Sequence, residues 1–248
     1  MGKVEPKIEF LVAGARQLGI ILDPRQQSQF QNYLEILLEW NKRMNLVRFR
    51  TREELIRNHF LDSLWCTAGC SFENGRRVLD LGSGAGFPGI PLSISFPGLK
   101  VFLLEAQRKR CVFLREACRL LELSNCTILA GRAEKLAHLP HLRATFERVV
   151  VRALARLVVI VEFALPFLTC GGFLVALKGR DVEEELKEAG NALKILGGEI
   201  ARVIPYRFPG ETGRHVVVVH KTAQTPAPYP RRPGLPERRP LYGVQENV

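Results

Sequence analysis

A glycine-rich segment one third of the way along the chain most constrains how this chain can fold. Val78–Gly89 reads Val-Leu-Asp-Leu-Gly-Ser-Gly-Ala-Gly-Phe-Pro-Gly, with apolar residues just before the first glycine. We predict a strand that ends near Leu81, followed by a tight turn and a helix. Glycines at such a turn let the backbone approach a ligand closely at the carboxyl edge of a parallel sheet. The segment therefore predicts an α/β fold with a cofactor site at this turn.

From Arg76 onward, short apolar runs alternate with helical patterns. Helices are clearest at Arg108–Leu121 and at Asp181–Leu196, where Asp181 and Glu184 stand in capping-box register. Strands are expected at Arg76–Leu81, Lys100–Glu105, Cys126–Leu129, Phe146–Val151, Gly172–Lys178, Ala201–Tyr206 and His215–His220. This alternation favours a mostly parallel sheet with helices on both faces.

The two ends of the chain differ from this pattern. Residues 1–70 are expected to form an N-terminal helical extension, in which Asp23 and Pro24 begin one helix and Thr51 and Glu54 form a capping box at the start of another. Residues 71–221 are expected to form the sheet domain. Residues 222–248 form an arm with six of the chain's fifteen prolines and with four arginines. Proline at this density blocks helix and sheet, so we expect an extended basic arm, either disordered or laid over the domain.

Two cofactor classes fit the glycine turn. Gly84, Gly86 and Gly89 match the G-x-G-x-x-G pattern of dinucleotide sites, which makes a nicotinamide-dependent oxidoreductase one alternative. Asp80 favours S-adenosylmethionine, because a carboxylate suits that cofactor's cationic amine and is unfavourable beside a pyrophosphate. Glu105 ends the next strand, 23 residues after Gly82, and suits the ribose hydroxyls of either cofactor. We favour S-adenosylmethionine.

The charge of the chain suggests a polyanionic partner. Lys plus Arg is 36 and Asp plus Glu is 25, a formal net charge of +11. Surplus positive charge favours nucleic acid or an anionic membrane. The basic residues most suited to phosphate contacts cluster between two predicted helices, at one strand end and in the arm. These candidates for RNA binding are Lys42, Arg43, Arg48, Arg50, Lys178, Arg231, Arg232, Arg238 and Arg239. For Lys178 a carboxylate pair is an equal alternative.

Other classes of protein are disfavoured by the sequence. The most apolar stretch, Val149–Leu168, is interrupted by charged residues and a proline, so we expect no membrane span. The first residues lack the apolar core of a signal peptide, which predicts a cytoplasmic protein. Six cysteines occur without a C-x-x-C pair or clustered histidines, so we expect no metal site. A monomer is the default expectation.

At this point the motifs resemble those of one bacterial family. The sequence is similar to the RsmG (glucose-inhibited division protein B) family of S-adenosylmethionine-dependent methyltransferases. The motifs that carry the resemblance are Asn45-Leu46, His59–Ser63, Asp80–Leu92, Leu104–Ala106, Gly131–Glu134, Arg152-Ala153, Ala176–Gly179 and Tyr229–Pro236. The resemblance implies a class I methyltransferase fold, Rossmann-like with a seven-stranded, mostly parallel sheet. It also implies methylation of guanosine N7 in 16S ribosomal RNA of the small subunit, with S-adenosylhomocysteine as product.

The same resemblance implies roles for individual residues. Arg152 would stand at the substrate mouth, and no residue is implied as a certain catalytic acid or base. The cofactor-binding residues would be Asp80, Gly82, Ser83, Gly84, Gly86, Phe87, Glu105, Ala106, Gln107, Ala133, Glu134 and Arg152. His59 is expected to be a satisfied helix histidine. Because guanine N7 carries no proton, we expect in-line attack without an essential general base. A non-catalytic RNA-binding or ribosome assembly factor on the same fold is the alternative, and the arm is expected to bind RNA rather than cofactor.

Overall fold

One seven-stranded sheet organises the computed structural model, which describes residues 8–208 and 213–243. Its strands are β1 (Arg77–Leu81), β2 (Lys100–Glu105), β3 (Cys126–Ala130), β4 (Phe146–Arg152), β5 (Leu168–Lys178), β6 (Gly198–Tyr206) and β7 (Arg214–Lys221). The strand order is β3-β2-β1-β4-β5-β7-β6. Only β7 runs antiparallel to its neighbours, β5 and β6. The predicted seven-stranded, mostly parallel sheet is therefore confirmed.

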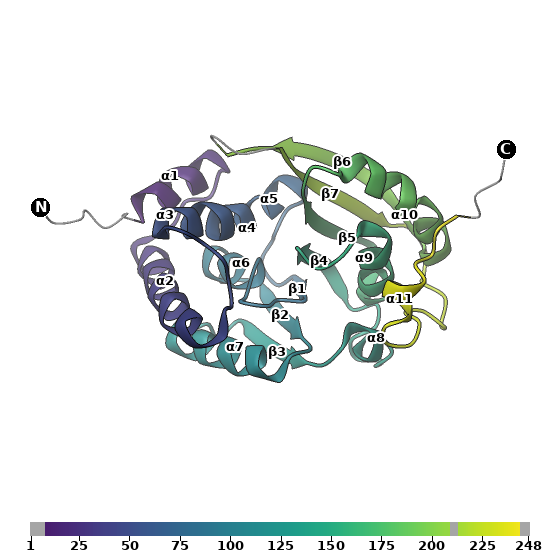
Figure 1. The fold of residues 1–248 in the computed structure, drawn as a ribbon, viewed down its shortest axis with the longest axis horizontal. Coiled ribbons are helices and arrows are strands. Elements are labelled where there is room, and N and C mark those ends of the chain that lie inside the picture. The colour runs from purple at the N-terminus through teal and green to yellow at the C-terminus, as the bar shows by residue number, and fades with distance from the viewer. Residues whose placement is uncertain (1–7, 209–212, 244–248) are drawn as a thin grey trace, which may run out of the picture.

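Helices cover both faces of this sheet (Figure 1). One side carries α1 (Glu9–Gln17), α2 (Pro24–Met44), α3 (Arg52–Leu55), the π-helix η1 (Ile56–Leu61), α4 (Asp62–Leu64), α5 (Cys66–Gly69), α6 (Gly89–Ser95) and α7 (Arg108–Leu120). The other carries α8 (Ala133–Leu136), α9 (Leu157–Ala164), the 3-10 helix η2 (Leu165–Phe167), α10 (Val182–Leu196) and α11 (Leu235–Arg238). Side chains alternate along a strand, so Val78 packs into the first apolar cluster and Leu79 into the second.

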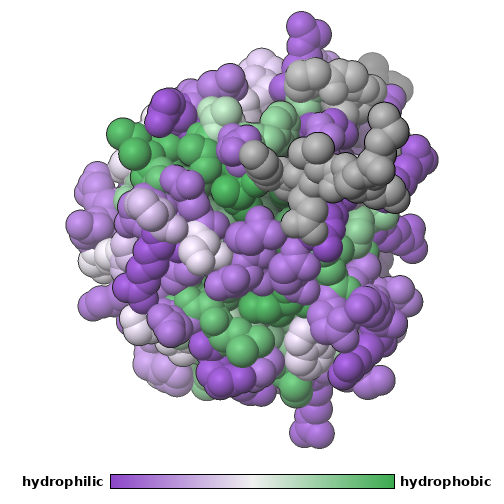
Figure 2. Space-filling model, turned by 90° about the vertical axis from the view of Figure 1, so that its left-hand side faces the viewer, coloured by the Kyte–Doolittle hydropathy of each residue, from purple (hydrophilic) through white to green (hydrophobic). Residues whose placement is uncertain are grey.

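The N-terminal helices share their core with the sheet. The capping box of α2 is complete: Asp23 accepts from the Gln26 N–H and Gln26 from the Asp23 N–H, both at 2.8 Å. The Gln26 amide then donates to the carbonyls of Ile94 (2.9 Å) and Ser95 (3.1 Å). Because the last carbonyls of a helix lack partners within the helix, this amide caps α6 from outside. The face seen from the side of these helices is mostly hydrophilic, with hydrophobic residues gathered in separate areas (Figure 2).

Helix α2 also fixes the glycine turn between β1 and α6. The buried Tyr33 hydroxyl donates to the Ala85 carbonyl at 2.5 Å. Gly86 has a φ of +90°, and a Cβ there would stand 2.8 Å from the Tyr33 oxygen. The turn therefore needs glycine both for its backbone conformation and for the approach of Tyr33.

Two predicted helix caps differ from expectation. Asp181 makes no side-chain cap at α10, because its ψ of 30° is not the extended conformation of an N-cap residue. The Glu184 carboxylate pairs with Arg156 at 3.4 Å. At α3, Thr51 accepts from the Glu54 N–H at 3.1 Å, while the Glu54 carboxylate bonds the Arg50 N–H rather than that of Thr51. The helix that follows Thr51 widens into the π-helix η1, which no residue pattern predicted.

The arm lies over the domain on the side of α8 and α9 (Figure 1). Arg143 anchors its first part by donating to the carbonyls of Thr225 (2.9 Å), Pro226 (3.1 Å) and Tyr229 (2.8 Å). Its prolines did not exclude helix entirely, since α11 forms one turn with proline near its start. Within residues 8–208 and 213–243, no helix has the length and apolarity that a membrane crossing requires.

Replacing Tyr33 by Phe is expected to cost about 1 kcal/mol of unfolding free energy, because the buried Ala85 carbonyl loses its donor. Urea unfolding of the variant and of wild type measures this cost. Tyr242→Phe is the matched control, since that side chain is 45% exposed. Equal effects of the two substitutions would contradict the role of the Tyr33 hydroxyl.

Candidate cofactor and substrate pockets

A cavity of about 330 Å³ opens where β1, β2 and β3 end. Six of the predicted cofactor residues line it: Gly82, Glu105, Ala106, Gln107, Ala133 and Glu134. Sequence reasoning did not predict the other lining residues, namely Leu81, Leu104, Arg110, Gly131, Arg132, Ala153, Leu154, Phe163 and Glu237. The volume lies in the range of small-molecule sites.

The glycine turn exposes bare backbone to this cavity. Gly82 has a φ of +74° and Gly84 a φ of +57°, both in the left-handed region that favours glycine. A Cβ on Gly82 would approach the Leu154 side chain to 2.8 Å. A side chain at Gly82 would therefore displace the wall that Leu154 forms.

Glu105 joins the turns that follow β1 and β2. One carboxylate oxygen accepts from the Gly84 N–H at 2.9 Å and the other from the Gln107 N–H at 2.7 Å. The Arg110 guanidinium stands 3.9 Å away, and the Glu105 side chain is only 6% exposed. Each carboxylate oxygen can accept a further hydrogen bond, so Glu105 can hold hydroxyl groups of a ligand without losing these contacts.

Asp80 lies behind the cavity wall. Its carboxylate is fully buried, and Oδ2 accepts from the Gly89 N–H at 2.9 Å, which fixes the start of α6. Oδ1 has no hydrogen-bond partner among the described residues. Burial raises the pKa of Asp80 to about 7. Asp80 is not among the residues that line the cavity, and in this structure it supports the turn from below; its contact with a cofactor stays a prediction. Ser83, also buried, donates to the Asp80 carbonyl.

A second cavity of about 350 Å³ meets the first at Ala153, which lines both. Its walls come from η1, α4 and the ends of β4, β5, β6 and β7, and they carry Asn58, His59, Asp62, Arg152, Ala153, Leu177, Lys178, Gly179, Tyr206 and Arg214. Ala153 has a φ of +49°, a conformation that non-glycine residues rarely adopt. Such outliers concentrate at functional sites, and this one joins the two cavities.

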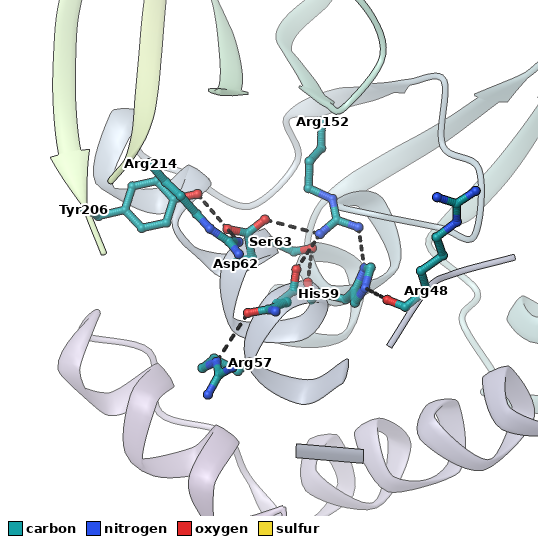
Figure 3. Close-up of polar contacts among 9 residues, drawn as sticks. Arg48, Arg57, His59, Asp62, Ser63, Arg152, Tyr206 and Arg214 are labelled. Atoms are coloured by element: carbon teal, nitrogen blue, oxygen red, sulfur yellow. Dashed lines mark hydrogen bonds and ion pairs between the residues drawn. The ribbon is translucent and has the colours of Figure 1, made fainter. Parts of the chain in front are cut away.

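The Asp62 carboxylate organises the second cavity (Figure 3). It accepts from Arg152 at 3.2 Å, from Arg214 at 2.5 Å and from the Tyr206 hydroxyl at 2.7 Å. The Asp62 side chain is 5% exposed, and burial of its charge is compensated by the two guanidinium groups. Arg152, which was predicted to stand at the substrate mouth, lines this cavity and forms an ion pair with Asp62.

His59 is held as a neutral acceptor beside Arg152. The Arg152 guanidinium donates to Nδ1 at 2.8 Å, and since arginine only donates, the ring proton lies on Nε2, 3.4 Å from the Arg48 carbonyl. Burial, aided by the charge of Arg152, lowers the pKa of His59 to about 4. The Arg152 guanidinium also lies 4.8 Å from the centre of the Phe87 ring, which places Phe87 near the second cavity rather than on the wall of the first.

Several predicted RNA-binding residues have carboxylate partners within the protein. Lys178 pairs with Glu185 at 2.6 Å and donates to the Ala155 carbonyl, which favours the alternative of a structural pair. Arg231 pairs with Glu162 at 2.7 Å, so its guanidinium is a structural anchor rather than a phosphate contact. Lys42 and Arg43 both pair with the exposed Glu39 and remain accessible to solvent. The other accessible candidates are Arg48, Arg50, Arg232, Arg238 and Arg239.

Sequence reasoning missed Asp62, Tyr206 and Arg214 as residues of the second cavity. Asp62 was the one with a signal, because it is a carboxylate on the apolar side of a predicted helix. The other two sit on strands whose placement beside Asp62 depends on the sheet order. Among the described residues, no three His, Cys, Asp or Glu side chains converge as metal ligands.

The low pKa of His59 implies that the folded protein loses stability in acid. The His59 ring binds its second proton more tightly in the unfolded chain, where its pKa is about 6.5. The stabilisation from neutral His59 is thus complete above pH 6.5 and is lost as the pH falls toward 4. We expect the difference in unfolding free energy between wild type and His59→Gln to shrink by about 1–2 kcal/mol from pH 7 to pH 5. Denaturant unfolding at both pH values measures it, and a pH-independent difference would contradict the shift.

Comparison with known proteins places this geometry in one family. The protein-family model described as "GidB: rRNA small subunit methyltransferase G" matches residues 26–209. The chain is 43% identical to Ribosomal RNA small subunit methyltransferase G of Pelotomaculum thermopropionicum over 235 residues, 94% of this chain and 98% of the relative. It is 45% identical to the protein of the same name in Chloroflexus aggregans over 228 residues, 90% of this chain and 93% of that one.

Solved structures agree on the fold. A variant of MtNAS in complex with S-adenosylmethionine superposes with a TM-score of 0.54 at 18% identity, covering 87% of this chain and 78% of that one. A SAM dependent methyltransferase from Aquifex aeolicus gives 0.52 at 19% identity, covering 66% and 92%. At such identities the likeness concerns the fold alone. The family match and the two relatives establish more: this chain belongs to the rRNA small subunit methyltransferase G (GidB) family of S-adenosylmethionine-dependent enzymes.

Proposed function

We propose that this chain transfers a methyl group from S-adenosylmethionine to N7 of a guanosine in 16S ribosomal RNA. The observation that carries the proposal is the meeting of two cavities at Ala153, one built on the glycine turn and Glu105, the other on Asp62 and its cationic partners. The cofactor supplies a methyl group activated by its sulfonium. The two cavities give it and the base adjoining sites at the carboxyl edge of the sheet.

The first cavity fits the parts of the cofactor. Glu105 offers two acceptor oxygens of a nearly buried carboxylate to the ribose hydroxyls. Ala133 and Glu134, at the start of α8, stand at the adenine end. The bare backbone of Gly82 serves the methionyl end. The turn is held by Tyr33 and Asp80 from behind, so it needs little reorganisation on binding.

The second cavity supplies orientation rather than acid–base chemistry. Guanine N7 has a lone pair and no proton, so the residues must align it and exclude water. The neutral His59 already accepts a hydrogen bond from Arg152, and Asp62 accepts hydrogen bonds from three donors. Neither side chain is therefore poised to accept a proton. Arg152 and Arg214 instead offer fixed positive charge toward a base that has left its stack.

The accessible basic residues suit the RNA backbone. The segment that contains Arg48 reaches the second cavity, since its carbonyl contacts the His59 ring (Figure 3). Exposed arginines and lysines near the cavity would contact phosphates without reading sequence, and binding would weaken with salt. RNA therefore would approach from the side of η1 and the residues before α3.

The geometry disfavours the alternative of a dinucleotide oxidoreductase. In such enzymes the pyrophosphate takes the free N–H groups at the start of the helix. Here the Gly89 N–H at the start of α6 is already bonded to the Asp80 carboxylate. A non-catalytic assembly factor would have no need for the preorganised turn, and the intact Glu105 contacts favour an enzyme instead.

A methyl-transfer assay tests the function directly. With labelled S-adenosylmethionine and small ribosomal subunits that lack the modification, we expect label in 7-methylguanosine. Gly82→Ala and Glu105→Gln should each lower kcat/KM at least about 10-fold, equivalent to about 1.4 kcal/mol. The methyl group added at Gly82 would strain the backbone and displace Leu154, and the amide introduced at Glu105 would replace one acceptor oxygen of the carboxylate by an N–H donor. Gly75→Ala is the control: Gly75 also has a positive φ (+83°), and a Cβ there touches nothing. Labelling of another nucleoside would overturn the choice of N7, and absence of both label and cofactor binding would favour the assembly factor.

The absence of a general base predicts a flat pH profile. At saturating cofactor and RNA, kcat should change less than about two-fold between pH 6.5 and 8.5, because no proton leaves N7 before attack. Initial rates across this range measure it. A profile that rises ten-fold per pH unit over part of the range would instead identify an essential base.

A further inference from the structure

We infer that residues 231–238 of the arm, the arm wall, form part of the cofactor cavity, and that Arg231 is the residue that positions them. The inference rests on the assignment of the first cavity to S-adenosylmethionine. It assigns the arm a role in cofactor binding, whereas its proline and arginine content had suggested RNA binding. Three sets of contacts carry it.

The arm wall reaches the cavity itself. Glu237 of α11 is one of the residues that line the cavity, although it lies 155 residues after Gly82 in the sequence. The Gly234 N–H donates to Glu134 Oε1 at 3.1 Å, and Glu134 lines the same cavity. Figure 1 shows α11 beside α8 and α9. The orientation of the nearly buried Glu134 carboxylate therefore depends on the arm.

A buried ion pair fixes the arm wall to α9. Glu162 is fully buried and accepts three hydrogen bonds from Arg231: from its backbone N–H (2.9 Å), from Nε (2.9 Å) and from Nη2 (2.7 Å). Nη2 also donates to the Arg239 carbonyl at 2.8 Å, which closes the loop that contains α11. A buried carboxylate without its partner is costly, so this pair holds the arm wall in one place. Phe163, the next residue of α9, lines the cavity.

Contacts between the loop after α8 and the two residues before the arm wall complete the attachment. His138 Nε2 lies 2.9 Å from the Pro230 carbonyl, and Arg143 donates to the Tyr229 carbonyl at 2.8 Å. Pro236, at the second position of α11, is buried. The arm wall is thus bonded to α8 through Gly234 and to α9 through Arg231, and the two residues before it are bonded to the loop after α8. Arg232, Arg238 and Arg239 point to solvent and make none of the side-chain contacts given for Arg231.

Two carboxylates, Glu134 and Glu237, line the end of the cavity where the arm wall lies. Such acceptors suit a ligand group that donates hydrogen bonds, such as an exocyclic amine, and disfavour a phosphate. If the arm wall contributes to binding, the reverse also holds: cofactor must stabilise the arm wall by the same coupling free energy. This reciprocity gives a measurement independent of catalysis.

The full-length chain with Arg231→Gln tests the inference, and Arg232→Gln is the matched control with the same change of charge one residue away. We expect the Kd for S-adenosylhomocysteine, measured by calorimetry, to rise about 10-fold in Arg231→Gln and less than two-fold in Arg232→Gln. The affinity of Arg231→Gln for small ribosomal subunits should stay within about two-fold of wild type at fixed salt. In steady state, KM for the cofactor should rise while kcat is kept, a split that general damage to the fold would not produce.

Gly234→Ala provides a second variant that leaves the buried pair intact. Gly234 has a φ of +78°, and a Cβ there would touch nothing, so the substitution strains only the backbone that presents its N–H to Glu134. A several-fold rise in the same Kd is expected, because alanine rarely adopts the left-handed conformation that residue 234 has here. In wild type, S-adenosylhomocysteine should also slow tryptic cleavage after Arg238, and this protection should be lost in Arg231→Gln.

The outcomes separate this inference from the proposed function. Wild type that binds S-adenosylhomocysteine, with unchanged affinity in both Arg231→Gln and Gly234→Ala, would overturn the role of the arm wall alone. Equal loss of RNA affinity in Arg231→Gln and Arg232→Gln, without loss of cofactor affinity, would restore the arm to RNA binding. Wild type that binds no S-adenosylhomocysteine would overturn the cofactor assignment and this inference with it.

Discussion

The hydrogen bonds that the buried Asp62 carboxylate accepts are the interactions on which the rest of the structure depends. Asp62 lies at the start of α4, in the N-terminal extension, yet its three donors come from β4, β6 and β7. A charge at this depth is stable only with such partners, so the extension and the sheet must close on each other to satisfy it. The same requirement brings Arg152 and Arg214 to one cavity. The contacts that join the extension to the sheet are therefore the same contacts that line the second cavity.

The glycine turn is likewise held in place by contacts from distant segments of the chain. Its backbone is held by Tyr33 from α2, by Asp80 from β1 and by Glu105 from β2, through contacts to Ala85, Gly89 and Gly84. Each of these contacts is made by protein groups alone. Three distant segments therefore order the turn when the protein folds. The free-energy cost of ordering it does not weaken ligand binding.

The features that sequence could predict are local ones. Each of the seven strands showed as a short apolar run, Asp23 followed by proline predicted the start of α2, and the glycines with Glu105 predicted the cofactor edge. What escaped prediction depends on pairing across long distances. Arg231 reads as one arginine among several until Glu162, 69 residues away, is seen to be fully buried beside it. Asp181 and Glu184 fit the capping-box pattern, yet the Glu184 carboxylate pairs with Arg156, which lies 28 residues before it in the sequence.

The π-helix η1 carries a consequence for how this site can change. A π-helical turn holds an extra residue, and each helical residue rotates the chain by about 100°. Loss of one residue between Ile56 and Leu61 would restore an ordinary α-helix, but it would also swing the segment before it, with the Arg48 carbonyl, around the axis away from His59. The position of the residues before α3 relative to the second cavity is therefore set by the number of residues in this segment.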